Sequence, residues 1–250
     1  MDFRDSTDLS RFNIVAQWEA PKNIVAFTTT RANGQSKPPF DSLNLGDHVG
    51  DDNAHVQQNR ASLISDYGLP GEPRWLSQTH STIVRHLDEG ADCVDPADGA
   101  ISNIAGVVCV VLTADCLPLF LCNDAGTKVG VIHAGWQGLA NGIVEQGVLA
   151  MGEAGDQLHA WAGPTISNKH FEIGNQVREQ LGGSSLAYRD SANTGKCFAD
   201  LYQLVRERLQ AVGVKKYTHS QHCTFADSKQ FFSHRRGRTT GRMASIIYIK

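Results

Sequence analysis

The segment VVCVVLTADCLPLFLCNDAGTKVGVIHAGW, residues 107–136, determines the fold class. It contains three apolar runs, at residues 107–112, 117–121 and 129–132, and the turn sequence Asn-Asp-Ala-Gly separates the second run from the third. Short continuous apolar runs rich in valine predict strands that are buried on both faces of a sheet. We therefore expect a buried sheet at the centre of the protein.

Further strands and helices surround this segment. Apolar periodicity and β-branched runs predict strands at residues 24–29 and 244–249, an extended segment at 75–87, and helices at 52–67, 136–151 and 200–212. The helix at 200–212 has Asp200 as a capping residue, Gly213 at its end, and a buried stripe made by Leu201, Leu204, Val205 and Leu209. This mixture predicts an α+β (mixed α/β) layered sandwich of mixed sheet and helices, with residues 1–250 forming a single domain.

Charge and hydropathy exclude several classes of protein. Among 250 residues, 23 Lys and Arg face 26 Asp and Glu, so the net charge is −3, which argues against a nucleic-acid-binding protein. The longest apolar run, residues 104–112, is about half of the ~18 residues that a membrane span requires. We therefore expect neither nucleic acid nor membrane as a partner.

The N-terminus and the cysteines predict a cytoplasmic protein. The first five residues, MDFRD, have neither the basic nor the apolar region of a signal peptide. Six cysteines stand at positions 93, 109, 116, 122, 197 and 223, and none form a C-x-x-C pair. We interpret them as reduced thiols.

Three residues with metal-binding side chains stand beside the predicted strands. They are His80, Cys116 and His133, and we expect the ends of the strands to bring them together. One thiolate and two imidazoles suit Zn²⁺ or a copper ion, and three protein ligands leave a fourth position open, as in catalytic sites.

The same residues support a second interpretation. Cys116 and His133 could form a thiolate–imidazolium pair for nucleophilic catalysis, with Asp115 or Gln78 orienting the histidine. That arrangement would make the protein a hydrolase or amidase. Free cysteine is also one of the most frequently buried residue types, so a core role for Cys116 stays open as well.

An arginine-rich segment precedes the last predicted strand. Residues 231–242 contain Arg235, Arg236, Arg238 and Arg242, with Gly237 and Gly241 between them. Guanidinium groups bind phosphate and carboxylate in a bidentate manner, and glycine allows the backbone to approach an anion. The segment is either an anion site, with phosphate as the candidate ligand, or a solvated basic loop.

Several motifs in order along the chain resemble one known family. They are Phe27-Thr28-Thr29-Thr30-Arg31, Ser42-Leu43-Asn44-Leu45-Gly46, Gln78-Thr79-His80, Ala97-Asp98-Gly99-Ala100, Thr113-Ala114-Asp115-Cys116-Leu117-Pro118, His133-Ala134-Gly135-Trp136, Ala162-Gly163-Pro164 and Gly241-Arg242-Met243-Ala244. The chain resembles the multicopper polyphenol oxidase, or laccase-domain, family. Its members were later described as broad-specificity purine nucleoside phosphorylases.

The resemblance implies a chemistry and a set of residues. It implies one zinc ion held by His80, Cys116 and His133, with copper as an alternative metal. The implied reactions are phosphorolysis of adenosine, inosine, guanosine and methylthioadenosine to base and ribose-1-phosphate, and deamination of adenosine. The implied fold is a layered sandwich similar to that of cysteine-hydrolase toxin domains.

Further residues become candidates for the site. Arg31 and Asn44 lie in motif-bearing loops and are candidates for the substrate pocket, and Arg235, Arg236 and Arg242 are candidates for phosphate. Asp115 is a candidate catalytic residue because it is adjacent to Cys116. The chain departs from the family pattern at Gln137, where arginine is usual, and at His234, where tyrosine is usual.

Two other functions stay open at this point. Copper-dependent polyphenol oxidation fits less well, since the chain has three methionines and no His-x-His pair with which to build a multi-copper centre. A metal-dependent binding module for nucleotides or cell-wall precursors is the non-enzymatic alternative. The sequence makes no prediction of oligomeric state.

Overall fold

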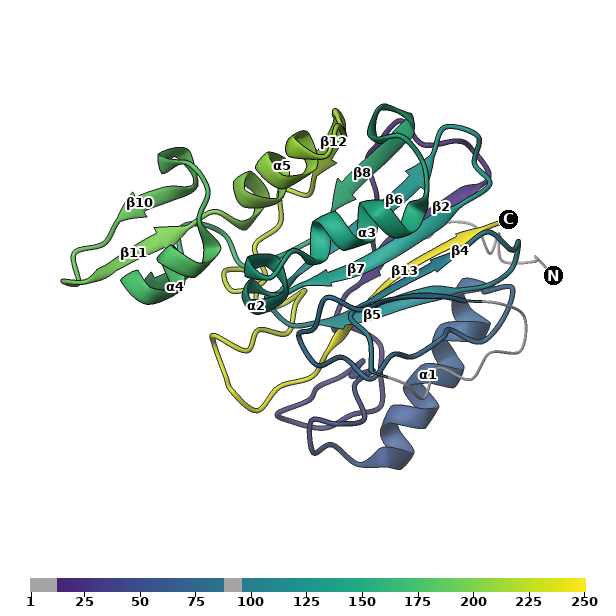
Figure 1. The fold of residues 1–250 in the computed structure, drawn as a ribbon. Coiled ribbons are helices and arrows are strands. Elements are labelled where there is room, and N and C mark those ends of the chain that lie inside the picture. Colours follow the sequence, from purple (N-terminus) through teal and green to yellow (C-terminus); the bar gives the residue numbers. More distant parts are fainter. Residues whose placement is uncertain (1–12, 88–95) are drawn as a thin grey trace.

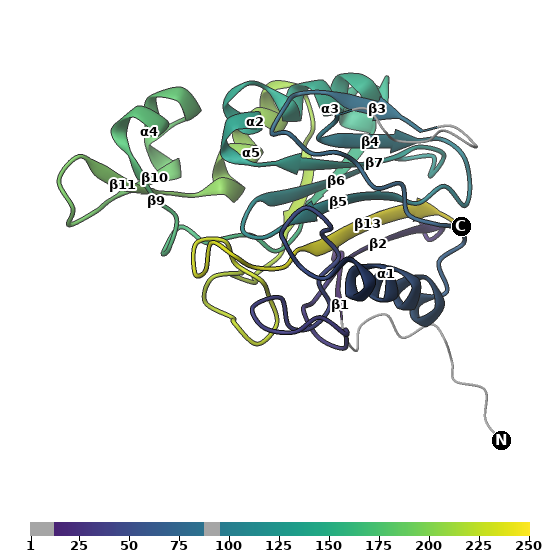
Figure 2. The same ribbon diagram turned by 90° about the horizontal axis from the view of Figure 1, so that it is seen from below.

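The computed structural model describes residues 13–87 and 96–250. Two β-sheets lie face to face, with helices on the outer face of each, so the molecule has four layers (Figure 2). One sheet has six strands and the other has four. The α+β layered sandwich expected from the sequence is confirmed.

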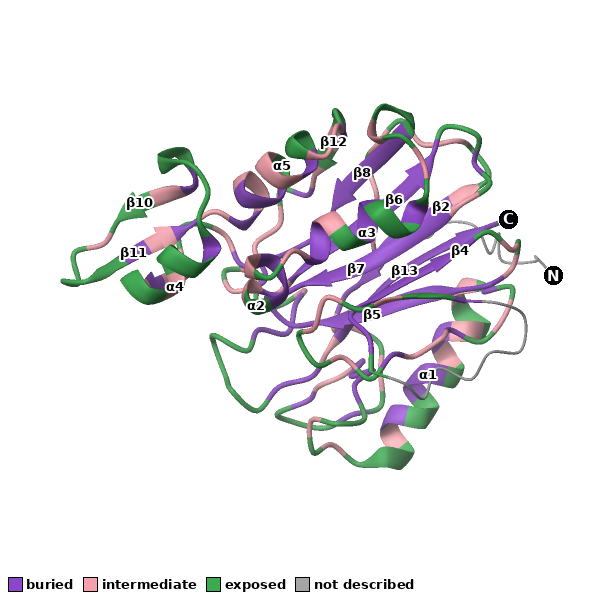
Figure 3. Ribbon diagram, in the orientation of Figure 1, coloured by how far each residue is buried: buried purple, intermediate pink, exposed green. Residues whose placement is uncertain are grey.

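The six-stranded sheet contains two of the apolar runs from the central segment. Its strands lie in the order β12 (Lys216–His219), β8 (Leu158–Ala162), β6 (Leu117–Asn123), β7 (Val129–Ala134), β4 (Gly99–Ser102) and β3 (Val84–His86). All residues of β6 and β7 are buried (Figure 3), because this sheet is covered on both faces. The strands predicted at 117–121 and 129–132 are therefore confirmed.

The four-stranded sheet has the order β1 (Asn13–Val15), β2 (Ile24–Thr29), β13 (Met243–Ile249) and β5 (Cys109–Thr113). Strand β13 is antiparallel to both β2 and β5 and lies between them. The predictions at 24–29, 107–112 and 244–249 are confirmed to within two residues. Phe120 and Trp161, with ring centroids 5.2 Å apart, pack between the two sheets with Ile247.

Helices cover the outer faces of the sheets. Helix α1 (Asn53–Tyr67) begins after Asp52, whose side chain accepts a hydrogen bond from the Ala54 amide, and packs Leu63 against the four-stranded sheet. Helices α3 (Ile143–Met151) and α5 (Leu201–Ala211) lie on the other side of the molecule, over the six-stranded sheet (Figures 1 and 2). The four residues predicted as the buried stripe of α5 are all buried.

The prediction of one continuous helix at residues 136–151 is wrong. The segment forms two helices, α2 (Trp136–Ala140) and α3, and the chain between them passes through Gly142 in a left-handed conformation with φ of 96°. Glycine adopts this conformation without steric cost, so the helix stops and restarts there. The break gives α2 its own direction beside the end of β7.

A small lobe projects from the sandwich (Figure 1). It contains β9 (Glu172–Gly174), α4 (Asn175–Leu181), β10 (Tyr188–Asp190) and β11 (Lys196–Ala199), with sheet order β10-β11-β9. Short 3₁₀ helices lie at η2 (Gly155–Gln157) and η3 (Ser185–Ala187). In the segment 75–87, which the sequence predicts to be extended, β3 is a strand of three residues, and Ser77 forms a single β-bridge. Arg74, just before the segment, forms another.

The predictions for the six cysteines and for the N-terminus fall partly outside this description, because Cys93 and residues 1–12 lie outside the described residues. In residues 13–87 and 96–250 no helix has the length and apolar character needed to cross a bilayer.

The N-terminus of α5 provides a test of local stability. One Asp200 carboxylate oxygen accepts a hydrogen bond from the Gln203 amide at 3.1 Å, and the other accepts one from the Asn168 side chain at 2.7 Å. Replacing Asp200 with alanine is expected to lower the free energy of unfolding by about 1 kcal/mol, since an orphan helical N–H loses its partner. Urea denaturation measures this, and Asp200→Asn, which keeps the capping oxygen, should lose less. Equal losses in the two variants would contradict a capping role.

Candidate metal centre

A cavity of about 430 Å³ opens at one end of the two sheets. Its volume lies in the range of small-molecule sites. Polar and charged side chains line one part of it and apolar side chains another. The lining comprises His48, Gln78, His80, Leu112, Thr113, Ala114, Asp115, Cys116, His133, Trp136, Ile166, Phe171, Leu201, His234, Arg235 and Arg242.

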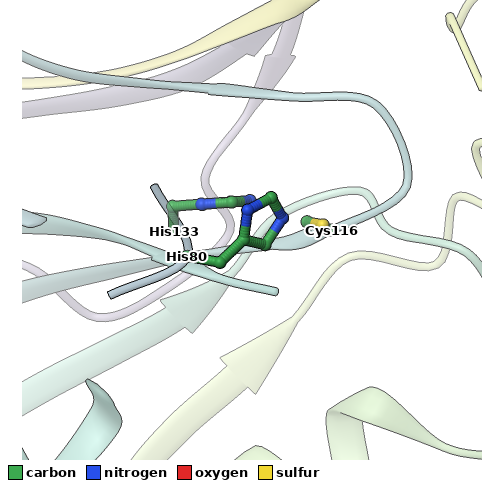
Figure 4. A group of neighbouring side chains, drawn as sticks. All are labelled: His80, Cys116 and His133. Carbon is green, nitrogen blue, oxygen red and sulfur yellow. The ribbon is translucent and has the colours of Figure 1, made fainter. Parts of the chain in front are cut away.

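The three metal-ligand candidates lie together in this cavity. The ligand atoms of His80, Cys116 and His133 are all within 4.8 Å of one another, and the group could hold a metal ion. The two imidazole rings have centroids 4.8 Å apart and meet edge to face (Figure 4). His133 is buried, Cys116 is half-buried and His80 is exposed, so the group faces the cavity from the protein interior.

Strand pairing brings these residues together in a way that differs from the expected one. The sequence predicts all three just beyond the ends of strands. His133 instead lies within β7, Cys116 directly precedes β6, and His80 is in the loop before β3. Because β6 and β7 are antiparallel, with Pro118 opposite His133, the start of β6 and the end of β7 meet at the same edge of the sheet.

Asp98 organises the two histidines. Its side chain is fully buried, and Oδ1 lies 2.8 Å from His133 Nδ1 and accepts a hydrogen bond from the His80 amide at 3.0 Å. Oδ2 accepts hydrogen bonds from the Thr79 amide and from the amide and hydroxyl of Ser81. A carboxylate on the distal nitrogen of a histidine fixes the ring orientation and directs Nε2 toward a metal.

The electrostatics of the group favour a charged Asp98. Burial alone would raise the pKa of Asp98, but hydrogen bonds from His133 and Ser81 and the charge on His133 outweigh burial and lower this pKa to about 2. The carboxylate is therefore ionised at neutral pH and accepts the hydrogen bonds of His133 and Ser81 in this form.

Cys116 and His133 shift each other's protonation. Burial would raise the pKa of Cys116, but the charge of His133 and hydrogen bonds from His133 and His80 lower it to about 6. Burial would lower the pKa of His133, while the Cys116 charge and the Asp98 hydrogen bond raise it to about 9. Both shifts favour a thiolate, which is the form that binds metal and the form that acts as a nucleophile.

The residue that orients His133 was missed by the sequence argument. Asp115 and Gln78 were the candidates for that role, whereas Asp98 makes the contact. The Gln78 amide instead exchanges hydrogen bonds with the backbone of Leu112. The sequence does contain a signal for this contact in Ala97-Asp98-Gly99-Ala100, where an acidic residue directly precedes a strand of small and apolar residues. A carboxylate buried at such a place requires several hydrogen-bond donors around it.

Two of the candidate phosphate-binding arginines line the cavity. Nη1 of Arg235 donates to the carbonyls of Glu172 at 2.9 Å and His170 at 3.4 Å, and Nη1 of Arg242 donates to those of Thr240 and Gly241. In the described part of the chain neither guanidinium has a carboxylate within salt-bridge distance, and neither Nε nor Nη2 has an acceptor. Each guanidinium therefore has one edge open to a ligand, and that of Arg235 also lies over the Phe171 ring, 5.4 Å from its centroid.

The other candidates for substrate contact lie outside the cavity lining. Arg31 forms an ion pair with Asp41 at 3.1 Å and lies over the Phe232 ring. Arg236 donates to the backbone carbonyls of residues 224, 225 and 231. Asn44 is fully buried, and its Oδ1 accepts a hydrogen bond from the Arg242 amide at 2.9 Å.

Asp115 lines the cavity, but hydrogen-bond donors occupy both of its carboxylate oxygens. Oδ1 accepts from Thr224 Oγ1 at 2.6 Å, and Oδ2 accepts from Ser233 Oγ at 2.9 Å and from the Arg235 amide at 2.7 Å. Its backbone has a positive φ of 90°, and His80 has one of 59°. Such backbone strain in non-glycine residues is concentrated at functional sites.

Several lining residues were not predicted from the sequence as site residues. Trp136, Phe171, Ile166 and Leu201 are its larger apolar side chains, and His48 and His234 are exposed residues of the lining. Leu201 is the first residue of α5 and Trp136 the first of α2, and the others come from loops, so only the tertiary fold brings them to the cavity.

Comparison with known proteins identifies the family. A family model described as multi-copper polyphenol oxidoreductase laccase matches residues 25–250. The chain belongs to this family. The family resemblance drawn from the sequence motifs is thereby confirmed.

Relatives in the family have names that refer to a nucleoside activity. The chain is 44% identical over 240 residues to purine nucleoside phosphorylase YfiH of Escherichia coli, which covers 94% of this chain and 98% of the relative. It is 42% identical over 238 residues to a purine nucleoside phosphorylase of Haemophilus influenzae, covering 93% and 97%.

Solved structures of this family have the same fold. The Neisseria meningitidis protein NMB0706 superposes with a TM-score of 0.90 at 38% identity, covering 96% of this chain and all of that one. YlmD from Geobacillus stearothermophilus gives a TM-score of 0.86 at 32% identity, covering 95% and 99%.

Proposed function

We propose that this protein is a zinc-dependent purine nucleoside phosphorylase that cleaves adenosine, inosine, guanosine and methylthioadenosine with phosphate. The observation that carries the proposal is the composition of one cavity. It contains a possible metal triad (His80, Cys116 and His133), two arginines with free guanidinium edges, and the aromatic side chains of Trp136 and Phe171. The names of the relatives support the same activity.

Each part of the cavity has a distinct task in this reaction. Phosphate must lie beside C1′ of the ribose, and the free edges of Arg235 and Arg242 can hold its oxygens in a bidentate manner. The ring of Trp136 offers flat apolar surface to a purine base, and the Phe171 ring lies under the Arg235 guanidinium, 5.4 Å from it. Zinc bound at the triad would supply Lewis acidity in the cavity.

The residues present fit zinc. A thiolate, two imidazoles and a carboxylate behind one imidazole are a donor set that zinc accepts, and the three ligands leave a position facing the cavity. Copper accepts the same donors and is the alternative metal. Multi-copper oxidase chemistry, named in the family description, requires several metal groups, while residues 13–87 and 96–250 contain a single candidate group.

Deamination of adenosine is the second reaction proposed for this cavity. Nucleobase deaminases use a glutamate as general acid and base beside their zinc. Among the residues that line this cavity the one carboxylate is Asp115, and it is already occupied by three donors. The geometry therefore favours phosphorolysis over deamination.

A Cys–His hydrolase is the competing function, because the Cys116 thiolate and protonated His133 would serve it equally well. The convergence of a third ligand, His80, on the pair favours the metal. Removal of metal separates the two functions: a phosphorylase of this kind loses activity with a chelator, whereas a Cys–His nucleophile keeps it.

The remaining proposals concern the setting of the protein. We infer a cytoplasmic location, since the cysteines at positions 116, 122, 197 and 223 are free thiols, as is usual in reducing compartments. We also infer that residues 1–250 form one domain, with small molecules as the partners.

Product identification tests the function directly. Metal-quantified protein is incubated with adenosine, with and without phosphate, and the products are separated by chromatography. Adenine and ribose-1-phosphate that appear only with phosphate are the expected result. Inosine formed without phosphate would establish deamination instead. Absence of both products with one metal per chain would refute the enzymatic proposal and favour a binding module.

Arg242 is expected to control the affinity for phosphate. Burial lowers the pKa of its guanidinium, and the charges of Cys116 and Asp115 oppose that effect, so it is a partly desolvated cation directed at the site. Arg242→Ala should raise the KM for phosphate by about 10- to 100-fold with unchanged zinc content, since an interaction with a desolvated charge is lost. Steady-state kinetics with varied phosphate measures this change.

Arg206→Ala is the matched control, because Arg206 is exposed on α5 over the Tyr217 ring and does not line the cavity. If Arg242→Ala and Arg206→Ala had the same KM for phosphate, Arg242 would have no part in phosphate binding.

A further inference from the structure

Asp115 lies between the metal triad and the arginine-rich segment at residues 231–242 and contacts that segment. It is adjacent to Cys116, and its carboxylate accepts three hydrogen bonds from Thr224, Ser233 and the backbone of Arg235. Thr224 and Ser233 are buried, and Asp115 itself is 8% exposed. These contacts join parts of the chain that are more than 100 residues apart in sequence.

The backbone of Asp115 is held as firmly as its side chain. Its carbonyl accepts hydrogen bonds from Thr165 Oγ1 at 2.6 Å and from the Ile166 amide at 3.1 Å. The positive φ of 90° persists because these surrounding contacts determine it. Asp115 therefore has a fixed position between Cys116 and the segment around Arg235.

The carboxylate has little capacity left for proton transfer. A carboxylate offers about four acceptor positions, and three of them are in use. A general acid or base must instead present a free oxygen to the substrate. The contacts of Asp115 are those of a residue that positions others.

The second cavity arginine is held in the same manner. The amide of Arg242 donates to Oδ1 of Asn44, just as the amide of Arg235 donates to Oδ2 of Asp115. In both cases a buried side chain fixes the backbone of an arginine whose guanidinium lines the cavity. The repeated arrangement assigns a common role to two residues from separate loops.

We propose that Asp115 is a positioning residue that holds Arg235 in the lining of the cavity for phosphate binding, and that it does not transfer a proton. This inference rests on the proposed phosphorylase function. Without the carboxylate, the segment at 233–235 loses two hydrogen bonds, those from Ser233 Oγ and from the Arg235 amide, and Thr224 Oγ1 loses its acceptor. The backbone of Arg235 is then held less firmly, and its guanidinium approaches the cavity from a less fixed position. Small displacements of a positioning group are sufficient to reduce its effect substantially.

The test uses Asp115→Ala in the zinc-loaded protein. Alanine removes both acceptor oxygens, so the Arg235 N–H and the Ser233 hydroxyl lose their acceptor. We expect the KM for phosphate to rise by about 10- to 100-fold, kcat to change little, and the zinc content to stay at the wild-type value. Hydrogen exchange in peptides covering residues 231–240 should become faster. Asp66→Ala, at an exposed position of α1, is the matched control.

Two results would overturn the proposal. Unchanged exchange in residues 231–240 would show that Asp115 does not hold this segment. Loss of kcat with an unchanged KM for phosphate would show that Asp115 takes part in the chemical step.

The proposal stays testable if the proposed function fails. If the wild-type protein shows no phosphate-dependent turnover, calorimetric titration with inorganic phosphate compares wild type with Asp115→Ala. Equal affinities overturn the positioning role, and weaker binding by the variant supports it. If Asp115→Ala does not fold, Ser233→Ala removes one donor and leaves the carboxylate, and the same shifts in exchange and in phosphate KM or affinity are expected at smaller size.

Discussion

Replacing Cys116 with alanine is expected to abolish metal binding and to reduce nucleoside phosphorolysis by roughly 10³-fold or more. Cys116 is the one thiol of the triad, and His80 and His133 alone are too few ligands for a stable zinc site. Metal analysis of the purified variant should fall from about one zinc per chain to background. The change removes little volume at a half-buried position, so the fold should persist.

Cys223 provides the matched control for this experiment. It is also a half-buried free thiol, but it lies outside the triad and the cavity lining. Cys223→Ala should therefore keep both zinc and activity. If Cys116→Ala bound zinc normally and lost only activity, the thiol would be a nucleophile, and the Cys–His hydrolase would replace the metal enzyme as the function.

Replacing Asp98 with asparagine is expected to weaken zinc binding by about 10- to 100-fold without removing any metal ligand. Asparagine has nearly the same shape, but an amide N–H₂ group takes the place of one carboxylate oxygen. This group then faces either the donors of Thr79 and Ser81 or the donor of His133. His133 then loses its carboxylate partner, and the His80 loop loses part of its support. Competition with a chromogenic chelator measures the affinity.

Asp98 is also expected to contribute to stability in a pH-dependent way. Its pKa in the folded protein is about 2, below the usual value of 3.8, so the ionised form stabilises the fold. This stabilisation, about 2 kcal/mol, is complete above pH 4 and is lost as the pH falls toward 2. Asp98→Asn lacks this stabilisation at every pH. The difference in the free energy of unfolding between wild type and the variant should therefore shrink as the pH falls from 4 toward 2.

Thermal or urea unfolding of metal-free protein across this pH range tests the second effect separately from the first. Asp156→Asn, at an exposed position in η2, is the control and should follow wild type. A constant difference in stability between wild type and Asp98→Asn from neutral pH to pH 2 would show that Asp98 does not gain its low pKa from the fold.

The sequence predicted those elements whose signals are local. The central strands were evident as apolar runs, and α5 was evident from its stripe and from the cap at Asp200. The strands of the lobe were missed, because three or four residues carry too little periodicity and tertiary pairing determines them. The break between α2 and α3 depends on Gly142, and a glycine within an apolar segment can also remain helical.

The candidate site was predictable in its residue types but not in its connections. His80, Cys116 and His133 were selected because imidazole and thiolate bind metals, and they do lie together. The position of Asp98 beside His133 depends on the pairing of β4 with β7, across 35 residues of sequence. Arg235 and Arg236 are equivalent as sequence signals, and only the fold shows that Arg235 lines the cavity while Arg236 donates to backbone carbonyls.

The place of β13 in the four-stranded sheet also determines when the fold can be completed. Strands β2 and β5 do not pair with each other, and both pair with β13, which follows every other described element in the chain. During synthesis from the N-terminus, β2 and β5 must therefore wait with exposed edges until β13 has emerged. Exposed strand edges favour aggregation, so we expect nascent chains of this protein to depend on chaperones until β13 has been synthesised.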